Sequence, residues 1–397
     1  MSKKFRRIAL VVLSVVALLL IAGFLFARFW LDGYIKDRLV SAVDQGSRQM
    51  YALQVDQLHV NVFTGTAKVN GMHLMTDSLR WEERRQAEPG TTPQRMDLKI
   101  ANIAVRYFNW RRYWQDKQLV FSSIEITDPE ISLQSVQDSV LADDPKADSI
   151  KLRILDRLPQ MLAPIAKGLE IGSIEVYNGK MLLHAVNPRG TNSMQADSID
   201  MVVSRLNIQT QDTMQNGRAL YADNIMFTIR NYEVWPPGSV YAYRFKSATI
   251  MAGDSLVKIA GVSVMPTIPD GEFMQRFKIR KPRLRAQAKE VLVRKLNLFR
   301  ALHKNEWDME SVALDGVDIN IYQNKNIPPK LNKSMPNELF RDIQTYLNVD
   351  TLVMRNAHLL YKEVVEDGKG LLEFDHINGL ILNVTNDPLK MSDSTPA

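Results

Sequence analysis

The sequence predicts a mainly β protein with a few helices, in which an N-terminal transmembrane helix precedes an elongated, repeat-built antiparallel β-sheet. Three observations support this prediction. The chain begins with a long apolar run, apolar residues then alternate with polar ones over most of its 397 residues, and one strand-like phrase occurs four times. An apolar fraction of 45% with a charged fraction of 24% is typical of a folded chain and argues against disorder.

The N-terminus is typical of an uncleaved membrane anchor. Residues 1–7 (MSKKFRR) form a basic tail, and residues 8–29 contain the uncharged run IALVVLSVVALLLIAGFLFA. About twenty helical residues rise about 30 Å, enough to cross the hydrocarbon core. The basic cluster predicts a cytoplasmic tail, with everything after Arg28 across the membrane. A cleaved signal peptide is the rival interpretation, but its apolar region is usually only about 7–15 residues long, and GFLFARFW offers no good cleavage site.

The apolar spacing after the anchor predicts one amphipathic helix and then strands. Residues 31–50 space apolar side chains four apart, as a helix does. The following stretch, LQVDQLHVNVFTGTAKVNGMHL, alternates with a period of two around Gly65 and predicts a hairpin. Residues 80–95 are polar, and EPG and TTP indicate a loop. Two more amphipathic helices are expected at 148–169 and 335–347.

The repeated phrase follows a ten-residue template that is apolar at its first, third, eighth and tenth positions. It occurs in SIEITDPEISL (123–133), SIEVYNGKMLL (173–183), SVALDGVDINI (311–321) and TLVMRNAHLLY (351–361). We interpret each copy as a strand, a turn and a second strand, with Asp128–Pro129 at the corner of the first. The apolar positions are the candidate lining of a groove: Ile124, Ile126, Ile131, Leu133, Ile174, Val176, Met181, Leu183, Val312, Leu314, Ile319, Ile321, Leu352, Met354, Leu359 and Tyr361.

The flanks of the phrases divide the copies into two alternating types. The segments IAVRYFNWRRYW and VLVRKLNLFRAL lie the same distance upstream of the first and third phrases, so that Asn109 matches Asn297 and Arg112 matches Arg300. The second and fourth phrases each follow one of the two expected helices and are followed by similar tails. Such repetition predicts an array in which each unit buries its apolar face against its neighbours.

These features together resemble the AsmA-like envelope proteins. The anchor, the short helix and the hairpin LHVNVFTGTAKVNGMHL are similar to the way these proteins begin, and LVFSSIEITDPEISL resembles their recurrent strand–Asp-Pro–strand phrase. AHLLYKE followed by GLLEFDHINGLILNVTND is similar to members from Bacteroidota-type Gram-negative bacteria. The resemblance covers most of the chain. It implies a periplasmic β-taco, or groove, anchored in the inner membrane and associated with phospholipid traffic and outer-membrane integrity.

On this interpretation the chain has five parts. They are a cytoplasmic tail (1–7), a transmembrane anchor (8–29), a first AsmA-like β unit with its amphipathic helix (30–147), a helix with a β unit and an insert (148–285), and a second β repeat (286–397). Members of the family carry more sheet beyond the corresponding point, so we expect the second repeat to be truncated.

No catalytic constellation, metal site or cofactor motif is found in the sequence, and we expect neither enzyme activity nor a cofactor. The chain has no cysteine, its six histidines form no HExxH motif, and GxSxG, GxxxxGK[ST] and GxGxxG after a strand are missing. The acidic stretch ADDPKAD (142–148) lacks EF-hand spacing and is interpreted as a solvated linker. His59 and His358 lie in strand patterns and are expected at the surface or in hydrogen bonds.

Charge and aromatic residues narrow the choice of partner. The net charge of +6 is mild and its charges alternate along the chain, so no nucleic-acid partner is expected. In YFNWRRYW (107–114), Trp110 and Trp114 could lie at a membrane interface with Arg111 and Arg112 facing phosphates, but a packed connector between strands is the favoured interpretation.

What covers the apolar face decides the function. A closed sandwich would bury the face on itself, whereas an open groove would hold acyl chains. The anchor, the repeats and the resemblance favour a groove: a single-pass inner-membrane protein, mostly periplasmic, that binds membrane phospholipids for transport or outer-membrane maintenance. The alternative is a non-enzymatic envelope scaffold or assembly factor whose sheet edge recruits an envelope protein partner by strand addition.

Overall fold

The computed structural model describes residues 32–45, 47, 49–87, 95–136, 159, 162–163, 166–187, 190–210, 221–236, 238–329, 343 and 345–387. The predicted tail and anchor (1–29) and the acidic stretch 142–148 lie outside these residues. Among the helices that are described, none is long and apolar enough to cross a membrane. The amphipathic helix predicted near the N-terminus is present at residues 32–45.

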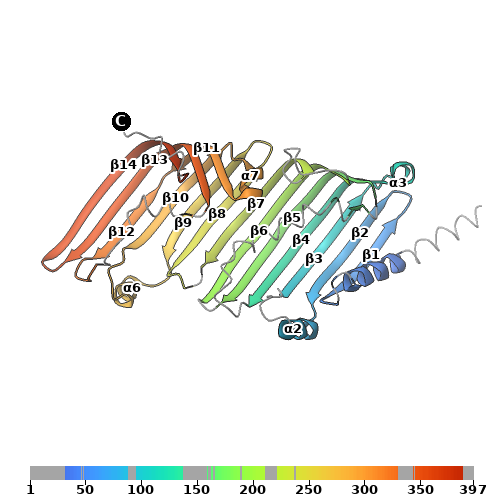
Figure 1. The fold of residues 1–397 in the computed structure, drawn as a ribbon, viewed down its shortest axis with the longest axis horizontal. Helices are drawn as coiled ribbons and strands as arrows, with labels where there is room; N and C mark the ends of the chain where they lie inside the picture. The colour runs from blue at the N-terminus through green and yellow to red at the C-terminus, as the bar shows by residue number, and fades with distance from the viewer. Residues whose placement is uncertain are drawn as a thin grey trace, which may run out of the picture.

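The described residues form one long sheet of fourteen strands, which confirms the prediction of a mainly β chain (Figure 1). Its first half contains β1 (Tyr51–Asn61), β2 (Thr66–Thr76), β3 (Arg95–Arg106), β4 (Gln118–Val136), β5 (Gly168–Asn187), β6 (Gly190–Gln209) and β7 (Ala222–Trp235). Its second half contains β8 (Tyr241–Met251), β9 (Leu256–Pro266), β10 (Arg283–Arg294), β11 (Glu306–Asp315), β12 (Asp318–Asn324), β13 (Tyr346–Val365) and β14 (Gly368–Thr385).

The sheet is mixed: most neighbouring strands are antiparallel, as predicted, but three pairs are parallel. Strand β4 pairs in parallel with β5, and β13 pairs in parallel with both β11 and β12. Parallel neighbours need a connection of a dozen or more residues that returns the chain to the starting rim, whereas antiparallel neighbours can join through a short turn. The long segments that follow β4 and β12 meet that requirement. The helices expected at 148–169 and 335–347 lie mostly outside the described residues, and their last residues belong to β5 and β13.

The repeated phrase does not form a strand–turn–strand. The copies at 123–133, 173–183 and 351–361 lie inside the continuous strands β4, β5 and β13. The copy at 311–321 is divided between β11 and β12. The fifth template position is left-handed in every copy, with φ of 52° at Asp128, 55° at Asn178, 59° at Gly316 and 50° at Asn356. Glycine and Asn or Asp tolerate this conformation best. What resembled the corner of a hairpin is therefore a local kink in a long strand.

These left-handed residues lie in one row across the sheet. Gly71 of β2, Asn231 of β7 and Gly261 of β9 are also left-handed and occupy the same row in the strand registers. At this row the apolar residues switch between odd and even positions, as they do between Ile100 and Ile103 of β3. A simple strand would send the two halves of such a pattern to opposite faces. Because the switch occurs at the same row in neighbouring strands, one face stays apolar from rim to rim.

The sheet contains two copies of one module. The hairpin β1–β2 has the same lengths and register as β8–β9, with Tyr51 paired to Thr76 and Tyr241 paired to Pro266. Strands β3 to β6 likewise correspond to β10 to β14, and β7 connects the two copies. The segment described as an insert in the sequence therefore contains β7 and the start of the second copy.

Short helices lie along the two rims (Figure 1). Helices α2 (Ser78–Ala87) and α6 (Asp270–Arg276) lie at one rim, and α3 (Trp110–Asp116) and α7 (Leu298–Lys304) lie at the other. A loop is predicted over residues 80–95, but residues 80–87 belong to helix α2, so the prediction is wrong there. Asp77 Oδ1 accepts the backbone N–H groups of Leu79 and Arg80, and Trp81, 3% exposed, packs under the Arg95 guanidinium.

Fully buried clusters are small and lie near the rim that carries α3 and α7. One contains Leu162, Ala166, Ile208 and Tyr221, and another contains Leu296, Ala301, Met309 and Val349. They hold the strand ends and the connecting helices together.

Candidate functional site

The apolar face of the sheet is the candidate functional surface, and the strand registers define it. Side chains alternate between faces along a strand, so residues paired across strands share a face. Ile126 of β4 pairs with Ile103 on one side and Val176 on the other, and Ile131 pairs with Leu98 and Met181 in the same way. The apolar residues on both sides of the row of kinks therefore belong to one continuous surface.

The structure places the sixteen predicted residues on this face in two groups. In β4 and β5 they pair in register, as Ile124 does with Ile174 and Leu133 with Leu183. In β11, β12 and β13 they pair the same way, as Val312 does with Leu352. All sixteen are partly exposed, neither fully buried nor open. At the row itself the facing positions are small or compact and buried: Pro129, Gly179, Val317 and Ala357.

Strands β6 to β10 fill the space between the two groups, and their apolar residues were not among the predicted lining. Phe227 of β7 pairs with Met201 of β6 and Ile250 of β8, and Ile259 of β9 pairs with Val291 of β10. Their alternation could have identified them, but the odd spacing at the row interrupts it. With these strands included, apolar residues extend across the sheet.

The opposite face is polar and carries ion pairs between neighbouring strands. Each pair joins a cation and an acid on adjacent strands: Arg106–Glu125 at 2.7 Å, Lys180–Glu130 at 3.1 Å, Lys258–Glu290 at 2.6 Å, Arg230–Asp200 and Arg244–Glu233. Exposed pairs of this kind contribute little stability each, about 0.2–1 kcal/mol. Their value here is that they identify the face that meets water.

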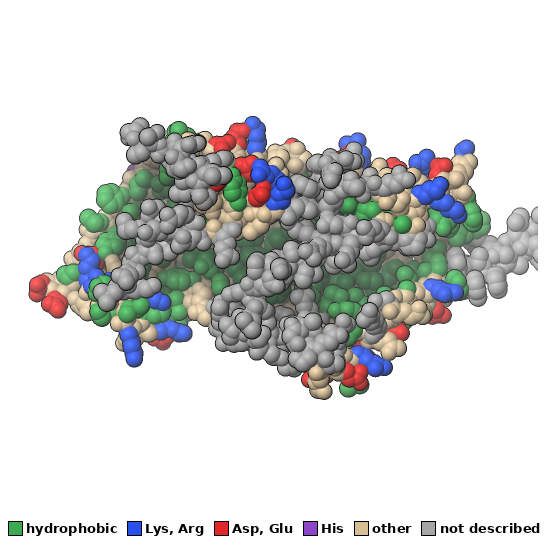
Figure 2. All heavy atoms as spheres, viewed as in Figure 1, with side chains coloured by type: hydrophobic (Ala, Val, Ile, Leu, Met, Phe, Trp, Pro, Cys, Tyr) green, Lys and Arg blue, Asp and Glu red, His purple; other side chains and the backbone are tan. Residues whose placement is uncertain are grey.

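The apolar face has charged borders. In Figure 2 apolar side chains lie along the middle of a hollowed face, and Lys, Arg, Asp and Glu side chains lie along its edges. Tyr361, the last of the sixteen residues, lies at such a border. Its hydroxyl is 2.9 Å from both Gln323 Oε1 and Glu363 Oε2, and burial, followed by the bond to Glu363, raises the pKa of the phenol. The apolar surface ends there.

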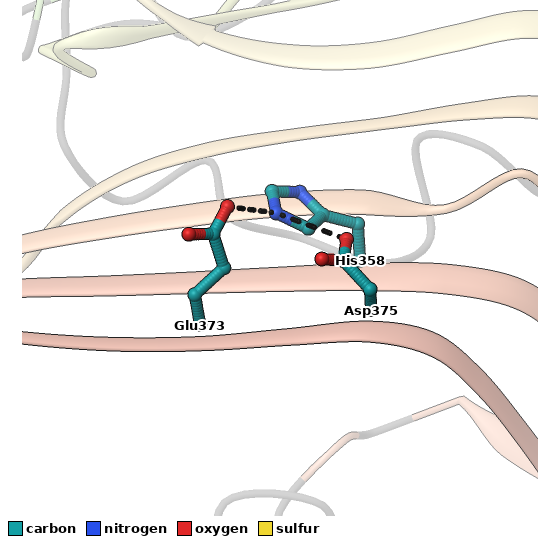
Figure 3. A group of neighbouring side chains, drawn as sticks. All are labelled: His358, Glu373 and Asp375. Carbon is teal, nitrogen blue, oxygen red and sulfur yellow. Dashed lines mark hydrogen bonds and ion pairs between the residues drawn. The ribbon is translucent and has the colours of Figure 1, made fainter.

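A polar cluster lies on the opposite face of the second copy (Figure 3). His358 Nε2 is 3.0 Å from Glu373 Oε1 and 3.6 Å from Asp375 Oδ1, and His358 Nδ1 is 2.9 Å from Asp318 Oδ1. The bond to Asp318 and then the bond to Glu373 raise the pKa of His358. The expectation that His358 is hydrogen bonded is confirmed.

The same cluster has the atoms of a metal site, although no metal site was predicted. His358, Glu373 and Asp375 each offer one ligand atom, and these atoms lie within 4.8 Å of one another. Glu373 and Asp375 are exposed, however, and because hydrogen bonds to carboxylates raise the pKa of His358, a proton competes with a metal for its ring nitrogen. The arrangement is better explained as a cation held by carboxylates.

The first copy holds a permanent cation at this position. Lys180 stands in β5 where β13 has His358, and it pairs with Glu130, the counterpart of Asp318. A shallow cavity of about 640 Å³ opens here, lined by side chains that include Lys99, Glu130 and Lys180. Its lining mixes these charged side chains with apolar ones such as Met75 and Leu182.

The aromatic-basic cluster of 107–114 forms the rim helix α3. Trp110 Nε1 donates to the Val62 carbonyl oxygen at 2.8 Å, so this side chain ties α3 to the β1–β2 hairpin. Trp114 is 70% exposed, and Arg112 pairs with Asp116 at 3.2 Å. Trp110, itself 40% exposed, therefore connects α3 to the hairpin, but no residue of α3 is buried as a packed connector would require.

No protein-family model matches the chain, and no curated protein matches it in sequence. The AsmA-like resemblance therefore stays a prediction.

Proposed function

We propose that this protein binds phospholipid acyl chains along the apolar face of its sheet and acts without covalent chemistry. The observation that supports the proposal is the continuity of that face across both copies of the module, with partly exposed apolar side chains and charged borders. A soluble domain rarely leaves a long apolar surface without a partner.

The mechanism is shielding. Acyl chains lie against the apolar side chains while head groups stay at the charged borders and in water. Each methylene removed from water contributes about 0.8 kcal/mol, so two long chains suffice for strong binding. With the predicted anchor and the AsmA-like resemblance, this supports an inner-membrane protein of the periplasm that carries phospholipid for outer-membrane maintenance.

A photo-crosslinking experiment in cells tests the proposal on the full chain. A photoreactive phenylalanine at Ile126 is expected to form phospholipid adducts, and one at Leu314, its counterpart in the second copy, is expected to do the same. The matched control is Glu125, the neighbouring residue on the polar face, which should give none. Adducts are identified by mass spectrometry of the purified protein.

The result that contradicts the proposal is crosslinking of Ile126 only to other parts of the same chain, which a closed sandwich predicts. As a second arm, Ile126→Asp should lower the phospholipid yield of a probe at Leu314 only slightly but abolish that of a probe at Val176, which pairs with Ile126. Loss of folding in that variant would instead assign Ile126 to a closed core.

A further inference from the structure

Exposed aromatic side chains lie at one corner of the sheet, where helix α3 meets the turn between β1 and β2. Of the described aromatic residues, the three most exposed belong to this aromatic corner: Phe63 at 74%, Trp114 at 70% and Tyr107 at 64%. At the opposite rim Trp81 of α2 is only 3% exposed, so exposed aromatic side chains are not general to the rims. Exposed apolar side chains that lie together mark an interaction surface.

The exposed side chains stand on a packed base. The backbone N–H of Phe108 donates to the Gly65 carbonyl oxygen at 2.7 Å, which joins the start of α3 to the β1–β2 turn. The centre of the Phe108 ring lies 4.5 Å from that of Trp110 and 5.0 Å from that of Phe121. These contacts hold the aromatic corner in one arrangement, so little conformational entropy is lost when a partner binds it.

Basic side chains border the aromatic corner. Arg111 Nε donates to Gln115 Oε1 at 3.3 Å, and Lys117 Nζ lies 5.6 Å from the centre of the Trp114 ring. These two partners are neutral, so both cations can attract phosphate groups. Trp and Tyr side chains beside basic residues are typical of the boundary between a bilayer and water, where an amphipathic ring lies among the head groups.

The aromatic corner also lies beside the point where the predicted anchor joins the sheet. Figure 1 shows α3 at the end of the sheet formed by β1 and β2. Asp32 Oδ1 accepts the backbone N–H of Val60 at 2.8 Å, three residues before Phe63. The predicted anchor ends at residue 29, and three residues of chain span at most about 11 Å. A bilayer that holds the anchor is therefore close to the exposed aromatic side chains.

The second copy of the module has replaced the aromatic corner. Each of its three residues has a non-aromatic counterpart: Gly253 for Phe63, Lys295 for Tyr107 and Leu302 for Trp114. The backbone is the same, since Tyr107 and Lys295 are both left-handed, with φ of 54° and 51°. Helix α7 packs against a core cluster, whereas α3 has no buried residue. The exposed aromatic side chains thus occur in the copy that lies next to the anchor.

We propose that the aromatic corner inserts into the head-group layer of the bilayer that holds the predicted anchor. A single anchor leaves the sheet free to swivel, and a second contact fixes its tilt. Strands β1 to β3 then lie nearest the bilayer and the second copy lies farther from it. The inference rests on the anchor, which is part of the proposed function, and it does not depend on acyl-chain binding by the sheet.

Quenching of a fluorescent label by spin-labelled lipid tests the contact on the full chain. The natural sequence has no cysteine, so Tyr107→Cys gives a single labelling site. The labelled protein is reconstituted in vesicles of phosphatidylethanolamine and phosphatidylglycerol, with or without lipid that carries a spin label near its head group. Fluorescence at position 107 should fall at least about twofold with the quencher, because the label lies among the head groups.

The matched control is Lys295→Cys, the counterpart in the second copy, whose side chain is 72% exposed. Seven strand spacings separate β3 from β10. Its label should lose no more than about a tenth of its fluorescence, because it lies roughly 34 Å farther along the sheet. The same label at both positions also controls for insertion of the fluorophore itself.

Two further variants test the aromatic side chains. Phe63→Ser with Trp114→Ser should reduce quenching at position 107 several-fold, because little apolar area is left to insert. Leu79→Ser should leave it unchanged, since Leu79 is 78% exposed but lies in α2 at the opposite rim. All these side chains are largely exposed, so the fold should stay intact, and circular dichroism checks this.

Equal quenching at positions 107 and 295 would overturn the proposal, because contact would then be a property of the whole rim. Quenching that survives loss of Phe63 and Trp114 would overturn it as well. No quenching in a chain that floats with the vesicles would assign the aromatic corner to a protein partner, and a chain that does not float would reject the anchor and this contact together. Crosslinking at Ile126 is measured separately, so failure of acyl-chain binding and failure of this contact are distinguishable.

Discussion

The two copies of the module share a backbone plan and differ in their side chains. Gly71 and Gly261 are left-handed at the same position of their hairpins, and Asn178 and Asn356 are left-handed at the same position of β5 and β13. The helices α3 and α7 begin at Asn109 and Asn297, whose side chains accept the backbone N–H of Arg112 and Arg300. What the copies have in common are the residues that determine backbone conformation.

The differences lie where a side chain meets water or a neighbour. The cation on the polar face is Lys180 in the first copy and His358 in the second. Strand β4 is continuous, whereas its counterpart is broken at Gly316 into β11 and β12. Strand β6 pairs with β5 and β7, whereas among the described strands β14 pairs with β13 alone. The shared plan builds the same sheet twice, and the differences give each copy its own surface.

The largest loss of stability is expected at the hairpin turn, where the first copy has a glycine and the second copy has a residue with a side chain. Gly65 has φ of 62°, and a Cβ there would lie 2.5 Å from the Phe108 carbonyl oxygen, a backbone atom that cannot move aside. Gly65→Ala should destabilise β1 to β3 by about 2–3 kcal/mol. Hydrogen exchange of their amides measures the change locally.

The counterpart of Gly65 is Ser255, which already carries a Cβ at φ of 50°. Ser255→Ala should therefore change the exchange of β8 to β10 by no more than about 0.5 kcal/mol. An equal loss of amide protection in both variants would contradict the expected difference between the two turns.

An intermediate effect is expected at the helix caps. Asn109→Ala and Asn297→Ala each remove one side-chain hydrogen bond to a helix N-terminus, worth about 1 kcal/mol. Helix α3 has no buried residue, whereas Ala301 of α7 is 8% exposed and lies in a core cluster. Amide exchange should therefore show α3 opening in the first variant and α7 staying closed in the second. The comparison fails if α7 opens as readily as α3.

The smallest effect is a dependence on pH that only the second copy should show. The carboxylates of Asp318 and Glu373 raise the pKa of His358 above its ordinary 6.5. A pKa that is higher in the folded state means that the stabilisation is complete below about pH 6.5 and is lost as the pH rises through the folded pKa. The protection factors of the β13 and β14 amides, which are exchange rates corrected for the intrinsic effect of pH on amides, should therefore fall over that range.

Replacing the histidine by the residue of the first copy is the control. His358→Lys should remove this pH dependence, because lysine stays charged far above pH 7, and Lys180→His should introduce one in β5 and β6. A pH dependence that survives His358→Lys would assign it to another group.

Much of the fold could be predicted from local periodicity, and the failures have physical causes. The strands, the repeats and the shared face of the apolar residues within each half of a phrase follow from alternation, whereas the shared face of the two halves depends on the kink between them. The odd spacing between Ile126 and Ile131 predicts a turn because a regular strand cannot hold it, whereas in the structure the left-handed Asp128 accommodates it within one strand. Parallel pairing was missed because it depends on long connections and not on the strands themselves.

Other features of the fold could not be predicted from one sequence. The second hairpin shares little with the first beyond positions such as Tyr51 and Tyr241, Lys68 and Lys258, and Gly71 and Gly261, so it was described as an insert. Helix α2 depends on burial of Trp81 against Arg95, a tertiary contact. The apolar residues of the strands that join the two halves of the apolar face could not be assigned to it, because the odd spacing at the row of kinks interrupts their alternation.

The equal registers of the two copies also matter for how the chain folds. Hairpins β1–β2 and β8–β9 offer edges of the same length and pattern, so β3 and β10 compete for the same two partners when the whole chain is unfolded. Synthesis separates the competitors in time. At about 5–20 residues per second, Tyr241 follows Tyr51 by roughly 10–40 s, long enough for the first hairpin to find β3. During refolding from denaturant both hairpins are present at once. We therefore expect some chains to be trapped with β3 or β10 paired to the wrong hairpin, an error that folding during synthesis avoids.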